Sequence, residues 1–151
     1  MASNTTTQYH GACICKSIHI TLQGEPVKAV ACHCLDCQKS AGGPYQTCAM
    51  YETKNLTVDD PSNNLKKYVF PKESALSGYE KHKFFCGVCG THLYNQPMKH
   101  NGEKSVIKTG FLDSADGPGV NLFKPEGELF TKDRASFAAP IEGVKQFEKG
   151  F

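Results

Sequence analysis

The chain has 151 residues, 39% of them hydrophobic and 21% charged, which favours one globular domain with its own core. It carries 17 Lys and Arg against 15 Asp and Glu, and the net charge of +2 argues against a strong generic attraction to nucleic acid or to membranes. No stretch approaches transmembrane length, and the first residues show neither the basic nor the apolar region of a signal peptide. We therefore expect a cytoplasmic protein whose cysteines are reduced.

Short segments of alternating polar and apolar residues, separated by turn-forming residues, run along the chain. Residues 1–8 predict a disordered tail, and residues 9–151 predict a single domain. A tight loop is expected at residues 38–44, and residues 140–151 have room for one helical turn. Helical periodicity is otherwise missing, so the predicted fold class is mostly β. The expected strands are residues 17–22, 27–31, 45–51, 56–58, 65–70, 81–85, 91–94, 105–109, 122–123 and 129–130.

The most informative stretch holds three thiols in the spacing C-x-C-x-x-C, at Cys32, Cys34 and Cys37. Local disulfides within it would close very short loops, so it suits a disulfide framework poorly. A metal ion, in contrast, takes several sulfur ligands that converge on one point. The cluster supplies three ligands, so a fourth comes from elsewhere or the position stays open to a substrate.

Two further cysteine pairs lie on either side of this cluster: C-x-C at Cys13 and Cys15, and C-x-x-C at Cys86 and Cys89. Sulfurs placed tetrahedrally at about 2.3 Å from zinc lie roughly 3.8 Å apart, and both spacings can reach that separation. Together the four thiols would make a closed site with a structural role. Spacing alone also allows the second pair to serve the central cluster instead.

The residues leave three possibilities for the fourth position of the central cluster: it is open, or Cys48 occupies it, or His33 occupies it. An open fourth position would make it a catalytic or substrate-binding zinc site. Cys48 or His33 could complete the shell of ligands, in which case both zinc ions would be structural. Cys48 also fits a buried free cysteine in a core strand, and His33 fits a structural or exposed side chain.

With these motifs in view, the chain resembles the glutathione-dependent formaldehyde-activating enzyme family, which also includes centromere protein V-like proteins. The match covers residues 9–147, nearly the whole chain, and the three cysteine motifs in this order are what make it specific. Trp, frequent near the C-terminus of the family, is missing, and Phe137 lies in the comparable region. The matching segments are Gly11-Ala12-Cys13-Ile14-Cys15, Cys32-His33-Cys34-Leu35-Asp36-Cys37-Gln38-Lys39-Ser40, Phe85-Cys86-Gly87-Val88-Cys89-Gly90-Thr91 and, more weakly, Gly110-Phe111-Leu112-Asp113.

The resemblance implies a small zinc-binding fold of the β-tent kind, made of several short antiparallel sheets. It implies two zinc ions per chain, a structural one on Cys13, Cys15, Cys86 and Cys89 and a reactive one on Cys32, Cys34 and Cys37.

The implied activity is that of a carbon–sulfur lyase, which adds the thiol of glutathione to formaldehyde or a related aldehyde-like electrophile. Gln38, Ser40 and Gly42 are the expected glutathione contacts. The competing interpretation is a non-enzymatic zinc module that binds a protein or chromatin partner. The oligomeric state does not follow from the sequence.

Overall fold

The computed structural model describes residues 6–150, which form two β-sheets and one α-helix. The smaller sheet has the strand order β1-β2-β5, and the larger has the order β11-β10-β3-β4-β9-β8-β7-β6. The prediction of a mostly β fold is confirmed. The strands are β1 (Gln8–Ala12), β2 (His19–Gln23), β3 (Lys28–Cys32), β4 (Gln46–Glu52), β5 (Leu56–Asp59), β6 (Leu65–Phe70), β7 (Lys81–Cys86), β8 (His92–Pro97), β9 (Lys104–Lys108), β10 (Gly127–Leu129) and β11 (Lys145–Gln146), and the helix is α1 (Leu35–Ala41).

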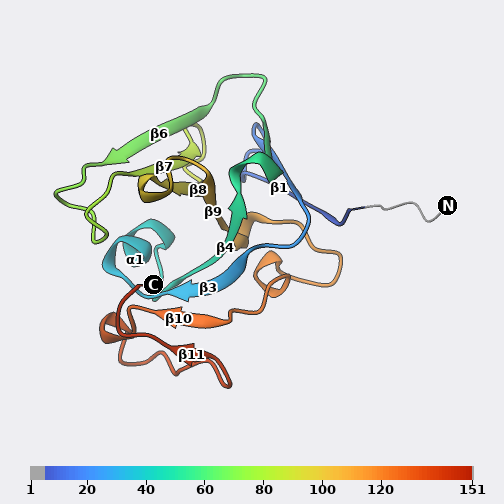
Figure 1. The fold of residues 1–151 in the computed structure, drawn as a ribbon. Coiled ribbons are helices and arrows are strands. Elements are labelled where there is room, and N and C mark those ends of the chain that lie inside the picture. The colour runs from blue at the N-terminus through green and yellow to red at the C-terminus, as the bar shows by residue number, and fades with distance from the viewer. Residues whose placement is uncertain (1–5, 151) are drawn as a thin grey trace.

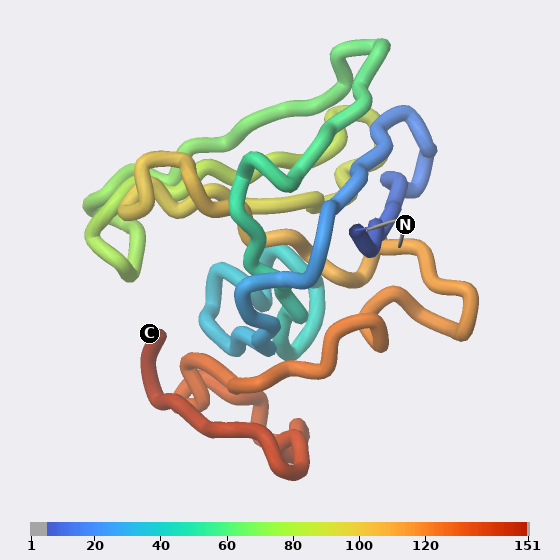
Figure 2. The backbone as a smooth tube through the Cα atoms, turned by 45° about the vertical axis from the view of Figure 1, so that its right-hand side comes forward, coloured from blue at the N-terminus to red at the C-terminus, as the bar shows by residue number. Residues whose placement is uncertain are grey.

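The large sheet curves around α1. Figure 1 shows the helix between the β6–β8 end of the sheet and the strands β10 and β11, and the turned view in Figure 2 shows the same arrangement. Most neighbouring strands of the large sheet are antiparallel, but β10 runs parallel to both β3 and β11.

Strand register gives the two faces of the large sheet different chemistry, because successive side chains point to opposite faces. One face carries apolar side chains such as Tyr94, Ile107 and Ala49, which are aligned across β8, β9 and β4. These pack with the inner side chains of β2, including Ile20 and Leu22, to form the main core. The small sheet therefore covers this face.

The opposite face of the large sheet is polar and carries α1. Registers place Lys83 beside Asn95, Lys108 beside Cys48, and Cys32 beside Gln46 on this face. Because β4 is covered on both faces, it has buried side chains on both of them. The buried residues of β4 are Gln46 and Cys48 on the helix side and Ala49 and Tyr51 on the core side. We call this polar side the helix face.

Several local predictions differ from the structure. Residues 38–44 were expected to form a loop, but α1 extends to Ala41 before the chain turns. At residues 140–151 there is the short strand β11 in place of a helical turn, and Leu122 follows a 3-10 turn, Gly119–Asn121, in place of a strand. Of the predicted tail 1–8, residues 1–5 lie outside the described part of the chain, and Gln8 belongs to β1.

The remaining short helical segments are single 3-10 turns that connect strands. None of the helices within residues 6–150 is long and apolar enough to span a membrane. These turns are Thr53–Asn55, Met98–His100, Thr109–Phe111 and Thr131–Asp133.

Candidate metal centres and the adjoining cavity

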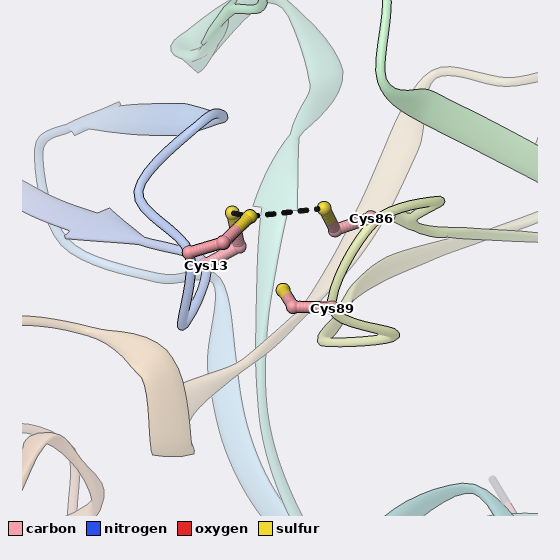
Figure 3. Close-up of side chains that lie close together, drawn as sticks. Cys13, Cys86 and Cys89 are labelled. Carbon is pink, nitrogen blue, oxygen red and sulfur yellow. Dashed lines mark hydrogen bonds between the residues drawn. The ribbon is translucent and has the colours of Figure 1, made fainter.

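The first cysteine cluster brings together the C-x-C pair near the N-terminus and the C-x-x-C pair in the middle of the chain. Figure 3 shows Cys13 on the loop after β1 facing Cys86, the last residue of β7, and Cys89 on the turn that follows. The sulfurs of Cys13, Cys15, Cys86 and Cys89 all lie within 4.8 Å of one another, with Cys15 at 3.5 Å from Cys13 and 3.6 Å from Cys86. Those separations match the roughly 3.8 Å expected between tetrahedral ligands of zinc.

Tight turns bring these thiols together. Gly90 has φ 75°, a conformation that disfavours side chains, and its N–H donates to the carbonyl of Cys86 at 2.9 Å. The Val88 N–H points to the sulfur of Cys86 at 3.4 Å. Backbone donors around a thiolate stabilise its charge, so this turn is suited to hold a metal ligand.

Two hydroxyl groups that the sequence interpretation did not single out complete the surroundings of the first cluster. Ser17 Oγ lies 3.2 Å from the Cys15 sulfur and 3.6 Å from the Cys86 sulfur. Thr91 Oγ1 lies 3.2 Å from the Cys89 sulfur and accepts the Ile14 N–H. The available signal was their spacing, since each follows a cysteine by two residues.

The second cluster is built where β3 passes into α1. Cys32 is the last residue of β3, Cys34 is the N-cap of the helix, and Cys37 lies in the first turn. The Cys34 sulfur accepts the Cys37 N–H at 3.4 Å, and the three sulfurs lie within 4.8 Å of one another. The structure therefore brings together Cys32, Cys34 and Cys37, as the sequence spacing predicted.

The chemistry of these donors fits a divalent cation. All eight cysteines are free thiols. Hydrogen bonds with Cys32 and Cys37 hold the pKa of Cys34 well below its usual range, and the same contacts raise the pKa values of Cys32 and Cys37. Three thiolates at this spacing repel one another, and a zinc ion between them removes that repulsion. Zinc would be held by the four thiols of the first cluster and the three of the second.

The alternative ligands of the central site lie elsewhere. His33 is buried, and its Nε2 is 2.7 Å from a carboxylate oxygen of Glu128 on β10. The Cys48 sulfur lies 3.3 Å from Lys108 Nζ and 3.6 Å from the Gln46 carbonyl. Neither side chain belongs to the groups of potential metal ligands found within the described residues.

The three expected glutathione contacts occupy different surroundings. Gln38 donates through Nε2 to the carbonyls of His33 at 2.7 Å and Asp133 at 2.8 Å. Gly42 is the C-cap of α1 with φ 66°. Ser40 lines a cavity between α1 and the β6–β7 hairpin.

That cavity has a volume of about 370 Å³, and the residue of its lining nearest in sequence to the second cluster is Asp36, which precedes Cys37. Asp36, Lys39 and Ser40 contribute one face of α1, since they are spaced three and four residues apart. The helix face of β6 and β7 supplies Tyr68, Phe70, Lys83 and Phe85, and Gly90 closes the end near the first cluster. The cavity thus combines aromatic rings with ammonium groups.

Positive charge gathers around the central cysteines. Lys81 pairs with Asp36 at 3.1 Å and lies over the Phe70 ring. Lys83 Nζ donates to Ser40 Oγ at 3.3 Å, and burial together with the ammonium groups of Lys108 and Lys81 lowers the pKa of Lys83. Such a group gains from a nearby anion.

Comparison with known proteins places the chain among relatives. The sequence pattern of the family described as glutathione-dependent formaldehyde-activating enzyme matches residues 8–133. The chain belongs to this family. The predicted relationship is therefore confirmed, and the match spans both cysteine clusters and the cavity.

Two individual proteins are similar to this chain, one in sequence and one in fold. A Schizosaccharomyces pombe protein named as an uncharacterized lyase is 30% identical over 87 residues, which are 58% of this chain and 56% of that protein. The match thus spans little more than half of either protein. A crystal structure of a Rhodobacter sphaeroides protein has a TM-score of 0.53 at 17% identity, covering 91% of this chain and 98% of that one. The second comparison shows a shared fold.

Proposed function

We propose that this protein is a zinc-dependent carbon–sulfur lyase that joins the thiol of glutathione to formaldehyde or a related small electrophile. The observation that carries the proposal is the central cluster, where three sulfurs converge and where no fourth His, Cys, Asp or Glu joins them among the described residues. Asp36, the residue before Cys37, lines the cavity on the same helix. Three protein ligands with one exchangeable position are typical of catalytic zinc. The four-cysteine cluster is complete and serves the fold.

Zinc, when bound by the three thiols, supplies positive charge that favours the thiolate form of a fourth, external thiol. The remaining work falls to side chains of this chain. Cys34 caps α1 and Cys37 lies in its first turn, so the helix fixes the cluster against the cavity. A thiol and an aldehyde held together there gain from proximity.

The cavity is suited to the rest of an anionic thiol. Glutathione carries two carboxylates, and Lys39 and Lys83 are the ammonium groups that line the cavity. Lys81 is already paired with Asp36. We therefore assign Lys83, bonded only weakly by the Ser40 hydroxyl at 3.3 Å, as the main carboxylate partner. Ser40 stays a predicted contact of glutathione. Gln38, in α1, and Gly42, the C-cap of α1, also stay predicted contacts.

The reaction needs no oxidant. The thiol loses its proton, the sulfur forms a bond to the carbonyl carbon, and the oxygen gains a proton, so the product is an S-hydroxyalkyl thioether. Lys108 places positive charge on the helix face, where it stabilises negative charge on that oxygen. The free thiols of the chain are consistent with the cytoplasmic location that we propose.

The test is native mass spectrometry combined with a measurement of adduct formation. We expect two zinc ions per chain, retention of one glutathione, and accelerated formation of S-(hydroxymethyl)glutathione. The Cys34→Ser variant keeps a residue that caps helices well, so we expect it to fold but to lose glutathione and activity. Cys48→Ser is the matched control, because Cys48 lies outside the cluster. Full activity of Cys34→Ser, or two zinc ions without any glutathione binding, would contradict the proposal and favour a non-enzymatic zinc module.

A further inference from the structure

The helix face of β4 and β8, next to the central cluster, carries polar side chains that have no role in the proposed chemistry. Gln46 on β4 is the cross-strand neighbour of Cys32, on the same face of the sheet. It is only 8% exposed, and its Oε1 has no hydrogen-bond partner among residues 6–150. A buried acceptor without a donor is unfavourable. A bound molecule with a hydrogen-bond donor would satisfy this oxygen.

A β-bulge fixes the side chains that hold Gln46. Phe84 pairs with Tyr94 but Phe85 pairs with His92, which leaves Leu93 as the extra residue of β8. In a regular strand His92 and Asn95 would lie on opposite faces, because they are three residues apart. The bulge puts both on the helix face, and bulges of this kind are common next to active sites.

The hydrogen bonds among Gln46, His92 and Asn95 have a defined donor and acceptor at each step. His92 Nε2 lies 2.9 Å from Asn95 Oδ1, an oxygen that only accepts, so Nε2 donates. His92 Nδ1 then accepts from Gln46 Nε2 at 3.3 Å. With its NH₂ group directed to the imidazole, the amide of Gln46 presents its carbonyl oxygen as a free acceptor.

The charges around His92 keep this arrangement. Burial, aided by the ammonium groups of Lys108 on β9 and Lys83 and Lys81 on β7, lowers the pKa of His92 to about 3. A neutral imidazole has one donor and one acceptor nitrogen, which is what the chain of contacts from Asn95 to Gln46 uses.

We propose that Gln46 Oε1 accepts a hydrogen bond from the hydroxyl group of the S-hydroxyalkyl product, and that His92 and Asn95 are its positioning residues. The inference rests on the proposed function and deepens it. When the sulfur–carbon bond forms, the carbonyl electron pair moves to oxygen, which takes up a proton and becomes a donor. Neither a bare aldehyde nor a plain thioether has that donor, so the site distinguishes the hydroxyl-bearing adduct.

The experiment uses the zinc-loaded full chain and measures interconversion of glutathione plus formaldehyde with S-(hydroxymethyl)glutathione by NMR exchange. For Gln46→Met we expect the KM for the adduct to rise about tenfold while the KM for glutathione stays within about twofold. Gln46→Glu keeps an acceptor oxygen but loses the NH₂ group that donates to His92 Nδ1, so it should restore only part of the adduct affinity. His92→Ala and Asn95→Ala should raise the KM for the adduct in the same selective way.

Gln96→Met is the matched control, because Gln96 lies on the opposite face of β8 and bonds to Ser105 Oγ at 3.3 Å. The side-chain ¹⁵N resonance of Gln46 should shift when glutathione and formaldehyde are added together, and not with glutathione alone. Wild-type activity with an unchanged adduct KM in Gln46→Met would overturn this inference and leave the lyase proposal standing. A wild-type protein without exchange activity would overturn both.

Discussion

The ammonium nitrogen of Lys108 lies 3.3 Å from the sulfur of Cys48, and the two side chains are 4% and 3% exposed. None of the ion pairs found within residues 6–150 involves this buried lysine. Burial alone would lower the pKa of Lys108, but the thiol groups of Cys48, Cys37 and Cys32 outweigh it and raise the pKa. The lysine therefore belongs electrostatically to the central cysteines, whose negative charge it balances.

Replacing Lys108 by Met should weaken zinc binding at the central cluster. The change keeps most of the side-chain volume but removes the positive charge, so the thiols give up their protons less readily. We expect a loss of zinc affinity of about tenfold, the lower end of the range seen for groups surrounding metal ligands. Competition with a chromophoric chelator measures it.

Lys104→Met is the control for this variant. Lys104 is on the same face of β9 but pairs with Glu52, away from the cysteines. Its replacement should leave zinc affinity unchanged. Equal zinc affinities in Lys108→Met and wild type would show that the lysine supports the fold alone.

The role of Lys108 also shows where sequence-based interpretation stops. The spacing of Cys32, Cys34 and Cys37 is local, so the sequence contains most of what brings them together. The contact between Lys108 and Cys48 depends on the register of β4 against β9, which lie 60 residues apart. Nothing in a single sequence marks which face of a strand a lysine occupies when the strand is buried on both sides.

Helix α1 could not be predicted for a related reason. Its seven residues bury no side chain completely, so they carry no apolar repeat. Isolated helices this short are unstable in water. The helix forms because the Cys34 sulfur caps its start and Gly42 allows the left-handed turn at its end. In contrast, β6 was predicted at residues 65–70 and is observed as Leu65–Phe70, because Pro71 marks its end clearly.

The two cysteine clusters should respond differently to loss of a ligand. Cys89→Ser removes one thiol from a closed cluster that connects the β1–β2 turn to the β7–β8 turn. We expect a loss of stability on the order of 5 kcal/mol, with a melting temperature lower by roughly 10–20 °C. Cys37→Ser should leave the melting temperature within about 5 °C while it abolishes zinc binding at the central cluster. Thermal unfolding with zinc analysis distinguishes them, and a similar large loss in both variants would make both clusters structural.

Acid should weaken the contact between β10 and the C-terminal segment through Glu128, which is 1% exposed. Burial by itself raises the pKa of this carboxyl, but donors from Gln146, the Ile141 N–H, His33 and Arg134 outweigh it and lower the pKa to about 2. Because the folded-state pKa is depressed, the carboxylate stabilises the fold above about pH 4.3, its unfolded pKa, and this contribution is lost as the pH falls toward 2.

Glu128→Gln should therefore cost on the order of 3 kcal/mol near neutral pH, and the difference from wild type should shrink between about pH 4.3 and pH 2. Urea unfolding in the presence of chelator, over that pH range, measures the difference without the pH dependence of zinc binding. Glu126→Gln is the control, since Glu126 is exposed and its carboxylate accepts the Ala29 N–H at 3.3 Å. A difference that does not vary with pH would assign the effect to packing and not to the charge of Glu128.

Lys83 offers the most direct test of how the cavity recognises its thiol. Lys83→Met removes the ammonium group that we assign to a carboxylate of glutathione while it keeps an unbranched side chain beside Phe85. A charge-assisted hydrogen bond of this kind is worth about 1.5–3 kcal/mol, so glutathione should bind at least roughly tenfold more weakly. Binding of 2-mercaptoethanol, which has no carboxylate, should change by less than about twofold.

Calorimetric titration of the zinc-loaded protein compares the two thiols, with Lys67→Met as the control. Lys67 lies on the same hairpin but faces away from the cavity, because it pairs with Phe84 on the opposite face. If Lys83→Met weakened the binding of both thiols equally, Lys83 would act on the central cluster as a whole, through the positive electrostatic potential that it creates together with Lys108. A selective loss for glutathione would instead assign the cavity between α1 and β7 to the carboxylate of the substrate.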